Sequence, residues 1–199
     1  MPVVSRRPSG VRADQTLQRA GRASRSSWFR WWPGARPAAE RRSVIHAMAK
    51  QTQFDLALEH AMNAAAKEKD VTKLPPPVRT LALVHAAQGV IDNGGLQYFF
   101  ESDFPGEPDY ALFVEAYRAI GADDAATTLE RAVALFPFGA PHKHVKKRNE
   151  FLDSFLDEDE QPVNSPFQPL TAKLCGNRSV WEKLKKYVAG HLADFGGRG

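Results

Sequence analysis

The sequence is poor in the residues and segments on which several classes of protein depend. It contains one cysteine, Cys175, among 199 residues, so it can form neither an internal disulfide nor a cysteine-rich zinc site. No apolar run approaches the roughly 18 residues that a membrane-spanning helix needs. A phosphate-binding loop, a nucleophile-elbow pattern and a zincin helix are also missing. These absences predict a cytoplasmic protein that uses no cofactor and no metal and does not enter a membrane.

Acidic residues and lysine are scarce at the start of the chain. Residues 1–47 contain ten arginines, no lysine and only Asp14 and Glu40, which gives a net charge of +8. Residues 48–199 contain 17 Lys and Arg against 21 Asp and Glu, a net charge of −4. The sequence pI near 9.3 therefore reflects the first segment, and the two parts belong to different classes.

The first 47 residues show no sustained hydrophobic periodicity, which predicts a disordered Arg-rich leader. Three interpretations stay open. The composition is typical of a transit peptide, or the aromatic cluster at 28–32 contacts a membrane surface or nucleic acid. Alternatively, Met48 is the true start and the upstream segment is not translated. In each case we expect residues 48–74 to form an N-terminal helix and linker, followed by a domain at 75–195.

From residue 53 onward, apolar residues recur at helical spacing, and no segment alternates with period two. This pattern predicts an all-α fold, a single compact domain of six to seven helices. The acid- and proline-rich stretch at 157–171 is expected to be a loop. The expected helices cover residues 53–67, 77–92, 96–102, 110–120, 123–136, 146–156 and 179–194.

The segment Asp92-Asn93-Gly94-Gly95 separates two of these helices. Asn and Gly tolerate the left-handed conformation that ends helices, so we expect a tight turn in which Asn93 caps backbone N–H groups. The alternative is a backbone nest that binds an anion. The three aromatics at 98–100 cannot all face one core. We expect two of them inside and one at the surface or in a groove.

Three separated stretches carry a family resemblance. Val90-Ile-Asp-Asn-Gly-Gly-Leu-Gln-Tyr-Phe-Phe-Glu-Ser is followed by Glu115-Ala-Tyr-Arg-Ala-Ile-Gly-Ala-Asp and then by Ala132-Val-Ala-Leu-Phe-Pro. Residues 75–195 thereby resemble the bacterial DNA-mimic-protein C-terminal-domain family, also catalogued as a domain of unknown function. The resemblance implies an all-helical fold. It also implies the role of one characterised branch, which presents carboxylates in place of DNA phosphates to occupy a DNA-binding protein. The family motif corresponds here to Asn93, Gly94, Gly95, Tyr98 and Phe99.

Imitating DNA requires dense, outward-facing acid, because the duplex carries about one negative charge per 1.7 Å of axis. Residues 92–130 have a net charge of −8, and residues 150–160 contain six acids and no base. The basic run at 142–148 interrupts this pattern, so an ordinary solvated surface with ion pairs is the competing interpretation. The candidate partner-binding residues are Asp92, Glu101, Asp103, Glu107, Asp109, Glu115, Asp123, Asp124, Asp153, Asp157, Glu158, Asp159 and Glu160.

The histidines and the cysteine do not form a catalytic pattern. His142 and His144 lie in a Lys/Arg run, whose cations oppose a bound metal ion. Cys175 begins a Cys-Gly-Asn segment that is typical of a turn. His85 lies a little under two helical turns from Asp92, but a half-buried histidine with its polar groups satisfied is the simpler expectation. We therefore predict no catalytic residue.

Taken together, the sequence predicts a non-enzymatic interaction module whose acidic surface binds a basic protein such as a DNA-binding regulator. Direct DNA binding by the folded domain is not expected. Two alternatives remain: a nucleic-acid-binding protein that uses the basic arms at 5–42 and 142–148, or a helical domain with a small-molecule or enzymatic role. The sequence does not predict the oligomeric state.

Overall fold

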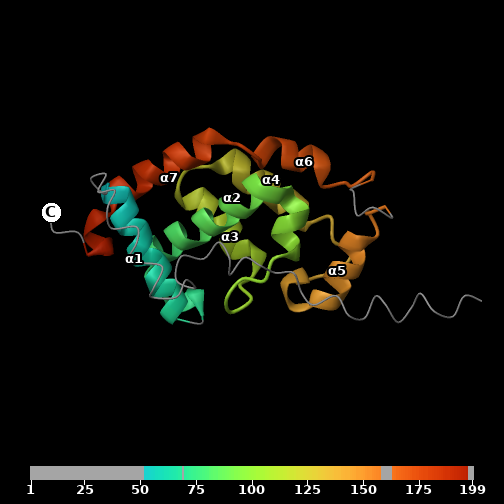
Figure 1. Ribbon diagram of the computed structural model, residues 1–199, viewed down its shortest axis with the longest axis horizontal. Helices are drawn as coiled ribbons and strands as arrows, with labels where there is room; N and C mark the ends of the chain where they lie inside the picture. The colour runs from blue at the N-terminus through green and yellow to red at the C-terminus, as the bar shows by residue number, and fades with distance from the viewer. Residues whose placement is uncertain (1–51, 69, 158–162, 197–199) are drawn as a thin grey trace, which may run out of the picture.

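The computed structural model describes residues 52–68, 70–157 and 163–196, and Figure 1 shows their arrangement. Every regular element in these ranges is a helix, so the predicted all-α fold is confirmed. None of the described helices is long and apolar enough to cross a bilayer. The predicted leader at 1–47 and the proposed start at Met48 lie outside the described residues.

Seven α-helices and three short 3-10 helices make up the described part of the chain. The α-helices are α1 Gln53–Lys67, α2 Pro76–Glu101, α3 Tyr110–Ala119, α4 Asp123–Val133, α5 Val145–Asp153, α6 Gln168–Leu174 and α7 Arg178–Gly190. The 3-10 helices are η5 Val71–Lys73, η6 Pro141–Lys143 and η7 Leu192–Phe195.

The first helix begins at a capping box, as the sequence pattern allows. The Thr52 side chain accepts a hydrogen bond from the Asp55 backbone N–H at 3.2 Å, and the Asp55 carboxylate accepts one from the Thr52 N–H at 3.0 Å. These bonds lower the pKa of Asp55. Ala61 and Ala65, one helical turn apart, are buried, and α1 packs against α2. Helix 53–67 is thus confirmed at both ends.

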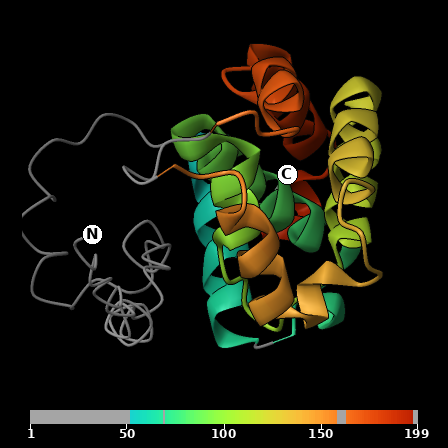
Figure 2. The same ribbon diagram turned by 90° about the vertical axis from the view of Figure 1, so that its right-hand side faces the viewer.

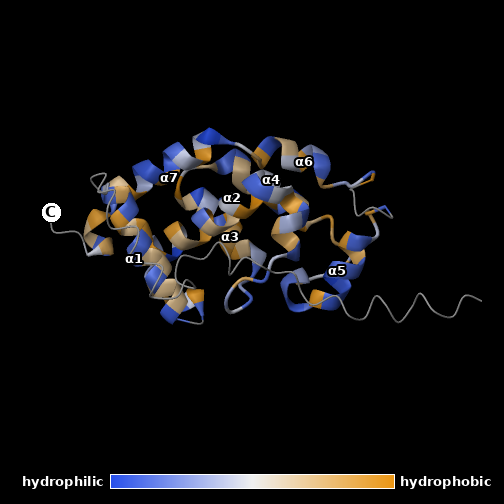
Figure 3. Ribbon diagram, viewed as in Figure 1, coloured by the Kyte–Doolittle hydropathy of each residue, from blue (hydrophilic) through white to orange (hydrophobic). Residues whose placement is uncertain are grey.

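Helix α2 is the central element. It packs against α1, α3, α5, α6 and α7. Figure 2 shows α2 between α1 on one side and the α3–α4 pair on the other. Along α2, Leu81, Val84 and Ile91 are completely buried. In Figure 3, hydrophilic and hydrophobic residues alternate around the helices, as expected when each helix turns one face to the core.

The structure confirms the break predicted between the helices at 77–92 and 96–102 and narrows it to one residue. The span labelled α2, Pro76–Glu101, consists of two helical segments joined across a kink, and the residue that departs from helical geometry is Gly95, with φ 74° and ψ −170°. Only glycine adopts this conformation readily. At this bend the Leu96 N–H donates to Thr171 Oγ1 of α6 at 3.1 Å.

Asn93 has a different role from the predicted one. Its side-chain amide donates to the carbonyl oxygen of Gly89, one turn earlier, at 2.6 Å, and does not cap backbone N–H groups. Thr171 supplies the acceptor at the bend. Gly94 makes room for Tyr98, since a Cβ at position 94 would lie 2.6 Å from the Tyr98 Cβ. The motif therefore combines a bend with a close side-chain approach.

The three consecutive aromatics divide as predicted. Phe99 and Phe100 are completely buried, whereas Tyr98 is half-buried. Phe100 lies at the centre of an aromatic cluster, with ring centroids 5.0 Å from Phe136 and 5.4 Å from Phe167. This cluster joins α2 to the segments after α4 and before α6, which are far apart in sequence.

A helix lies where the sequence predicts a loop. Within the expected loop at 157–171, α6 begins at Gln168. Its seven residues are too few to show a helical period, which explains why the pattern missed it. Tertiary contacts hold it instead, through buried Phe167 and Leu174 at its two ends.

Several helix boundaries also differ from prediction. Helix α4 begins at Asp123 as predicted, with Ala122 as an N-cap that makes no side-chain bond, and it ends at Val133, three residues early. Helices α5 and α7 end three and four residues early. Asp109 is the N-cap of α3, because its carboxylate accepts from the Ala111 N–H at 3.0 Å.

We expect Gly95→Ala to destabilise the domain by roughly 2–4 kcal/mol, measured by urea denaturation. The new Cβ would lie 2.7 Å from Thr171 Cγ2, and the backbone would stay in a region that alanine avoids. Gly89→Ala is the matched control on the same helix, since its Cβ meets nothing within 4 Å. That change should stabilise by about 0.5–1 kcal/mol. Equal effects at the two positions would contradict this account of the bend.

Candidate functional site

The first of the predicted acidic residues, Asp92, binds groups inside the fold. Its Oδ1 accepts from Gln88 Nε2 at 2.7 Å and from the Gly176 N–H at 2.8 Å, and its Oδ2 accepts from Trp181 Nε1 at 2.9 Å. The side chain is half-buried. Three donors on two oxygens fix this carboxylate, so we leave Asp92 out of the candidate surface.

Gln88 extends the same network into the core. It is completely buried, and its amide also donates to the Leu174 carbonyl oxygen at 2.9 Å. Its Oε1 accepts from the Tyr117 hydroxyl at 3.0 Å. Burial, and secondly the charge of Asp92, raise the pKa of Tyr117. The network therefore joins α2 to α3 and to the turn between α6 and α7, and we call it the Gln88–Asp92 network.

His85 is half-buried, as expected, and does not contact Asp92 in the way that the sequence spacing allowed. Its ring packs edge-on against Trp181, with centroids 5.6 Å apart. Burial lowers the pKa of His85. Trp181 thus connects the histidine to the network through packing alone.

Asp103 and Asp109 lie at the two ends of the segment that joins α2 to α3, residues 103–109, which we call the acidic loop. The guanidinium of Arg148 approaches Asp103 at 3.6 Å, and Nδ1 of His142 approaches Asp109 at 3.7 Å. Arg148 and His142 are 3% and 5% exposed. Two members of the basic run at 142–148 therefore point inward and do not interrupt the acidic surface as the sequence suggested.

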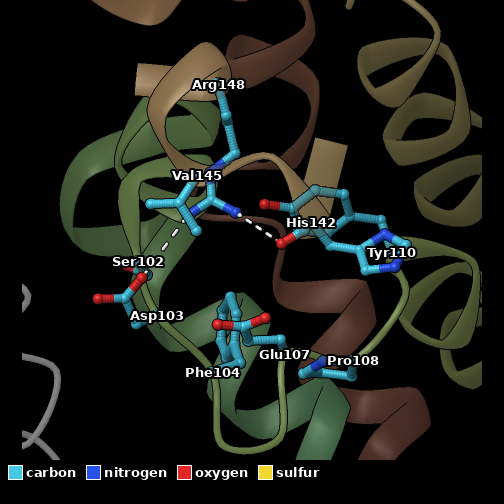
Figure 4. A pocket seen from close by; sticks show the side chains of 9 residues that line it. All are labelled: Ser102, Asp103, Phe104, Glu107, Pro108, Tyr110, His142, Val145 and Arg148. Carbon is cyan, nitrogen blue, oxygen red and sulfur yellow. Dashed lines mark hydrogen bonds and ion pairs between the residues drawn. The ribbon is translucent and has the colours of Figure 1, made fainter. Parts of the chain in front are cut away.

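Figure 4 shows the hollow that these residues line. Glu107 and Phe104 lie on the side facing Arg148, and Tyr110 closes another side. Burial raises the pKa of Tyr110 to about 12, while the Arg148 cation acts in the opposite direction. Glu107 is exposed and adopts φ 47°, a left-handed conformation that few residues other than glycine take.

Three further carboxylates, Glu115, Asp123 and Asp124, are exposed on α3 and on the first turn of α4. We call them the α3–α4 acidic surface. Within the described ranges no cation forms an ion pair with any of the three. Nearby Lys183 instead donates to the Gly121 carbonyl oxygen at 2.6 Å. The three carboxylates therefore have no ion-pair partner among the described residues, although the Lys183 cation lies at the turn that precedes Asp123.

Other charged residues on these helices and on α2 have partners. Arg118 of α3 pairs with Glu130 of α4 at 2.7 Å, which cancels both charges. Glu101 is half-buried and accepts from Gln97 Nε2 at 3.1 Å. These side chains contribute more to the stability of the fold than to the negative electrostatic potential at the surface.

The second predicted acidic stretch is only partly described. Asp153 and Asp157 are exposed, and Glu150 pairs with Lys146 at 3.8 Å. Glu158, Asp159 and Glu160 lie outside the described residues. The structure therefore places this stretch near α5 without defining its most acidic part.

A metal site requires several His, Cys, Asp or Glu side chains that lie close together. Among the described residues, no three His, Cys, Asp or Glu side chains lie close enough to hold a metal ion. Cys175 is exposed, with its sulfur 3.7 Å from the Asp92 carbonyl oxygen, and Gly176 has φ 70°. The predicted turn at this position is confirmed.

The described residues form an all-helical domain with a glycine bend in its central helix. The chain belongs to the DMP19-like protein family, whose sequence pattern matches residues 72–191, more than half of the chain. The matched region begins and ends within a few residues of the range 75–195 in which the resemblance was seen. No curated protein and no solved structure matches the chain.

We expect Asp92→Asn to lower the free energy of unfolding by about 2 kcal/mol, because an amide cannot accept from all three donors that face the carboxylate. Glu115→Gln is the control, since it removes one charge from an exposed side chain and should change stability by less than about 0.5 kcal/mol. Both are measured by urea denaturation. A stable Asp92→Asn variant would show that the network is dispensable.

Alkaline pH should unfold the domain in a way that depends on Tyr110. Its pKa in the folded state, about 12, lies above the ordinary value of 10.0, so the neutral phenol stabilises the fold below pH 10. This contribution, at most about 3 kcal/mol, is lost as the pH rises toward 12. In Tyr110→Phe the loss of stability between pH 10 and 12 should be smaller, as followed by circular dichroism. An unchanged pH profile would contradict the assignment.

Proposed function

We propose that the folded domain is a non-enzymatic protein-interaction module that binds a basic protein, and specifically the DNA-binding surface of a regulator. One observation carries the proposal. Glu115, Asp123 and Asp124 are exposed on two packed helices with no ion-pair partner among the described residues. The family to which the chain belongs supports the imitation of DNA.

Helices α3 and α4 suit the imitation of DNA because they are packed into the domain and keep the carboxylates at fixed positions. Helix α3 packs against both α2 and α4. The inner side of α3 is completely buried at Phe113 and Tyr117, and that of α4 is completely buried at Leu129. A phosphate backbone is also a series of negative charges at fixed positions. Carboxylates on packed helices reproduce that property better than carboxylates on flexible segments, which would have to be ordered on binding.

The acidic loop supplies a second set of negative charges. Asp103, Glu107 and Asp109 are exposed at the ends and in the middle of residues 103–109. The buried Arg148 cation beside Asp103 reduces, but does not remove, the local negative charge. We include these three residues in the proposed docking surface as a weaker part than the α3–α4 acidic surface.

The absence of catalysis is part of the proposal. The best-connected polar groups, Gln88, Asp92 and Tyr117, are engaged with one another inside the fold. Turnover of a substrate by the pure protein would contradict this part.

A nucleic-acid-binding role is the second candidate, and exposed lysines at Lys143, Lys146 and Lys147 favour it. Retention of oligonucleotides by the full chain, and equally by the chain that begins at Met48, would support this alternative. Loss of retention when residues 1–47 are removed would assign it to the leader instead.

The proposal predicts that the full chain, used as bait at about 50 mM salt, recovers a DNA-binding protein and releases it near 300 mM, because interactions between exposed charges are screened. Duplex DNA should compete with the bait for the recovered protein. A bait that recovers only neutral or acidic proteins would contradict the proposal.

The paired variants Glu115→Gln and Asp124→Asn together should weaken this binding about 3- to 10-fold, mainly through slower association. The matched control neutralises two acids outside α3 and α4, through Glu59→Gln on α1 and Asp194→Asn on η7. Surface plasmon resonance compares the two. An equal loss in both would show a response to net charge and not to the α3–α4 acidic surface.

A further inference from the structure

The acidic loop is held from beneath by side chains that a partner cannot reach. Arg148 on α5 and His142 on η6 are at least 95% buried, yet they contact Asp103 and Asp109 at the two ends of the loop. The guanidinium also reaches two backbone carbonyl oxygens of η6, at 3.5 Å each. One buried cation thus connects α5, η6 and the acidic loop, as Figure 4 shows.

The contacts of Arg148 are shared among several weak acceptors. The two carbonyl contacts are each 3.5 Å long and the contact with Asp103 is 3.6 Å, and Arg148 Nε has no hydrogen-bond partner among the described residues. A buried guanidinium is costly unless acceptors surround it, so the position of the Asp103 carboxylate over Arg148 compensates a buried charge. The side chain of Asp103 is nevertheless 49% exposed, compared with 4% for Arg148. The carboxylate therefore faces the cation and solvent together.

The middle of the loop shows that its shape is imposed. Glu107, with φ 47°, holds a conformation that persists only when the surrounding structure enforces it. The Glu107 N–H donates to the Phe104 carbonyl oxygen at 2.9 Å, and Phe104 packs in the aromatic core with its ring 4.7 Å from Phe113. Arg148 lies in the same hollow as Glu107. The core fixes one part of the loop and Arg148 the other.

We propose that Arg148 is a positioning residue for docking: it fixes the acidic loop so that Asp103, Glu107 and Asp109 stand in one arrangement before a basic partner arrives. This inference rests on the proposed function and names how part of that surface is organised. A partner then meets carboxylates that are already placed, and the cost of ordering the loop is not taken from the binding free energy.

This role can be separated from simple charge by the direction of the effect. Removing a cation makes the domain more negative, so electrostatic attraction alone predicts tighter binding of a basic partner. Loss of positioning predicts weaker binding from the same substitution. Lys146 offers a matched control, because it carries the same charge on the same helix and its side chain is 90% exposed.

The experiment compares Arg148→Met and Lys146→Met in the full chain. Hydrogen exchange of amides at 103–109 should accelerate about tenfold or more in Arg148→Met, while the buried amides of α2 keep their protection. Its affinity for the DNA-binding protein recovered by the low-salt pull-down should fall about 5- to 10-fold. A loss of this size is expected when the loop has to be ordered on binding. Lys146→Met should bind as tightly as the unmodified chain or more tightly.

Two outcomes overturn the inference: unchanged exchange in the loop, or an Arg148→Met variant that binds as tightly as Lys146→Met. If Arg148→Met does not fold, Arg148→Lys replaces it. That variant keeps the charge but loses the planar fork, and it should show the same faster loop exchange and weaker binding. Recovery of no partner would end the proposed function, and loop exchange alone would then decide whether Arg148 positions the loop.

Discussion

The structure depends on one half-buried carboxylate. Asp92, three residues before the bend at Gly95, accepts hydrogen bonds from Gln88 of its own helix, from the backbone of Gly176 and from the indole of Trp181. A negative charge at this depth is stable only when donors surround it, so the turn after α6 and the start of α7 must lie where they supply those donors. The bend itself is held by Thr171 of α6. The central helix, the C-terminal helices and, through Tyr117, helix α3 are therefore fixed by one polar network.

This constraint divides the charged residues of the domain into two groups. Asp92, Arg118, Glu130, His142 and Arg148 are engaged with protein groups, and they set distances between elements. Glu115, Asp123 and Asp124 have no such engagement among the described residues and stand on helices that the network and the aromatic core hold in place. The family motif thus has a structural role, and the proposed interaction surface lies on helices that the motif helps to position.

Much of the fold followed from the pattern of apolar residues, since long helices such as α1 and α7 repeat their buried positions often enough to be seen. Helix α6 was missed because seven residues contain too few repeats, and its stability comes from Phe167 and Leu174 in a core built by distant segments. The side-chain partners could not be predicted for the same reason. Asp92 and Gly176 are 84 positions apart in sequence, a pairing that no local spacing reveals. The inward direction of Arg148 in a basic run carries no sequence signal either. The outward acids of α3 and α4 could be predicted, because they occupy the polar face of amphipathic helices.

The central claim is that the Asp92 carboxylate joins α2 to α7 from inside the domain, and a double-mutant cycle tests it most directly. The free energy of unfolding is measured for the unmodified chain, Asp92→Asn, Trp181→Phe and the variant with both changes. If the indole N–H bond at 2.9 Å connects the helices, the two substitutions should be coupled by about 1 kcal/mol or more, in the sense that the second costs little once the first is made. Effects that add to within about 0.3 kcal/mol would contradict the claim.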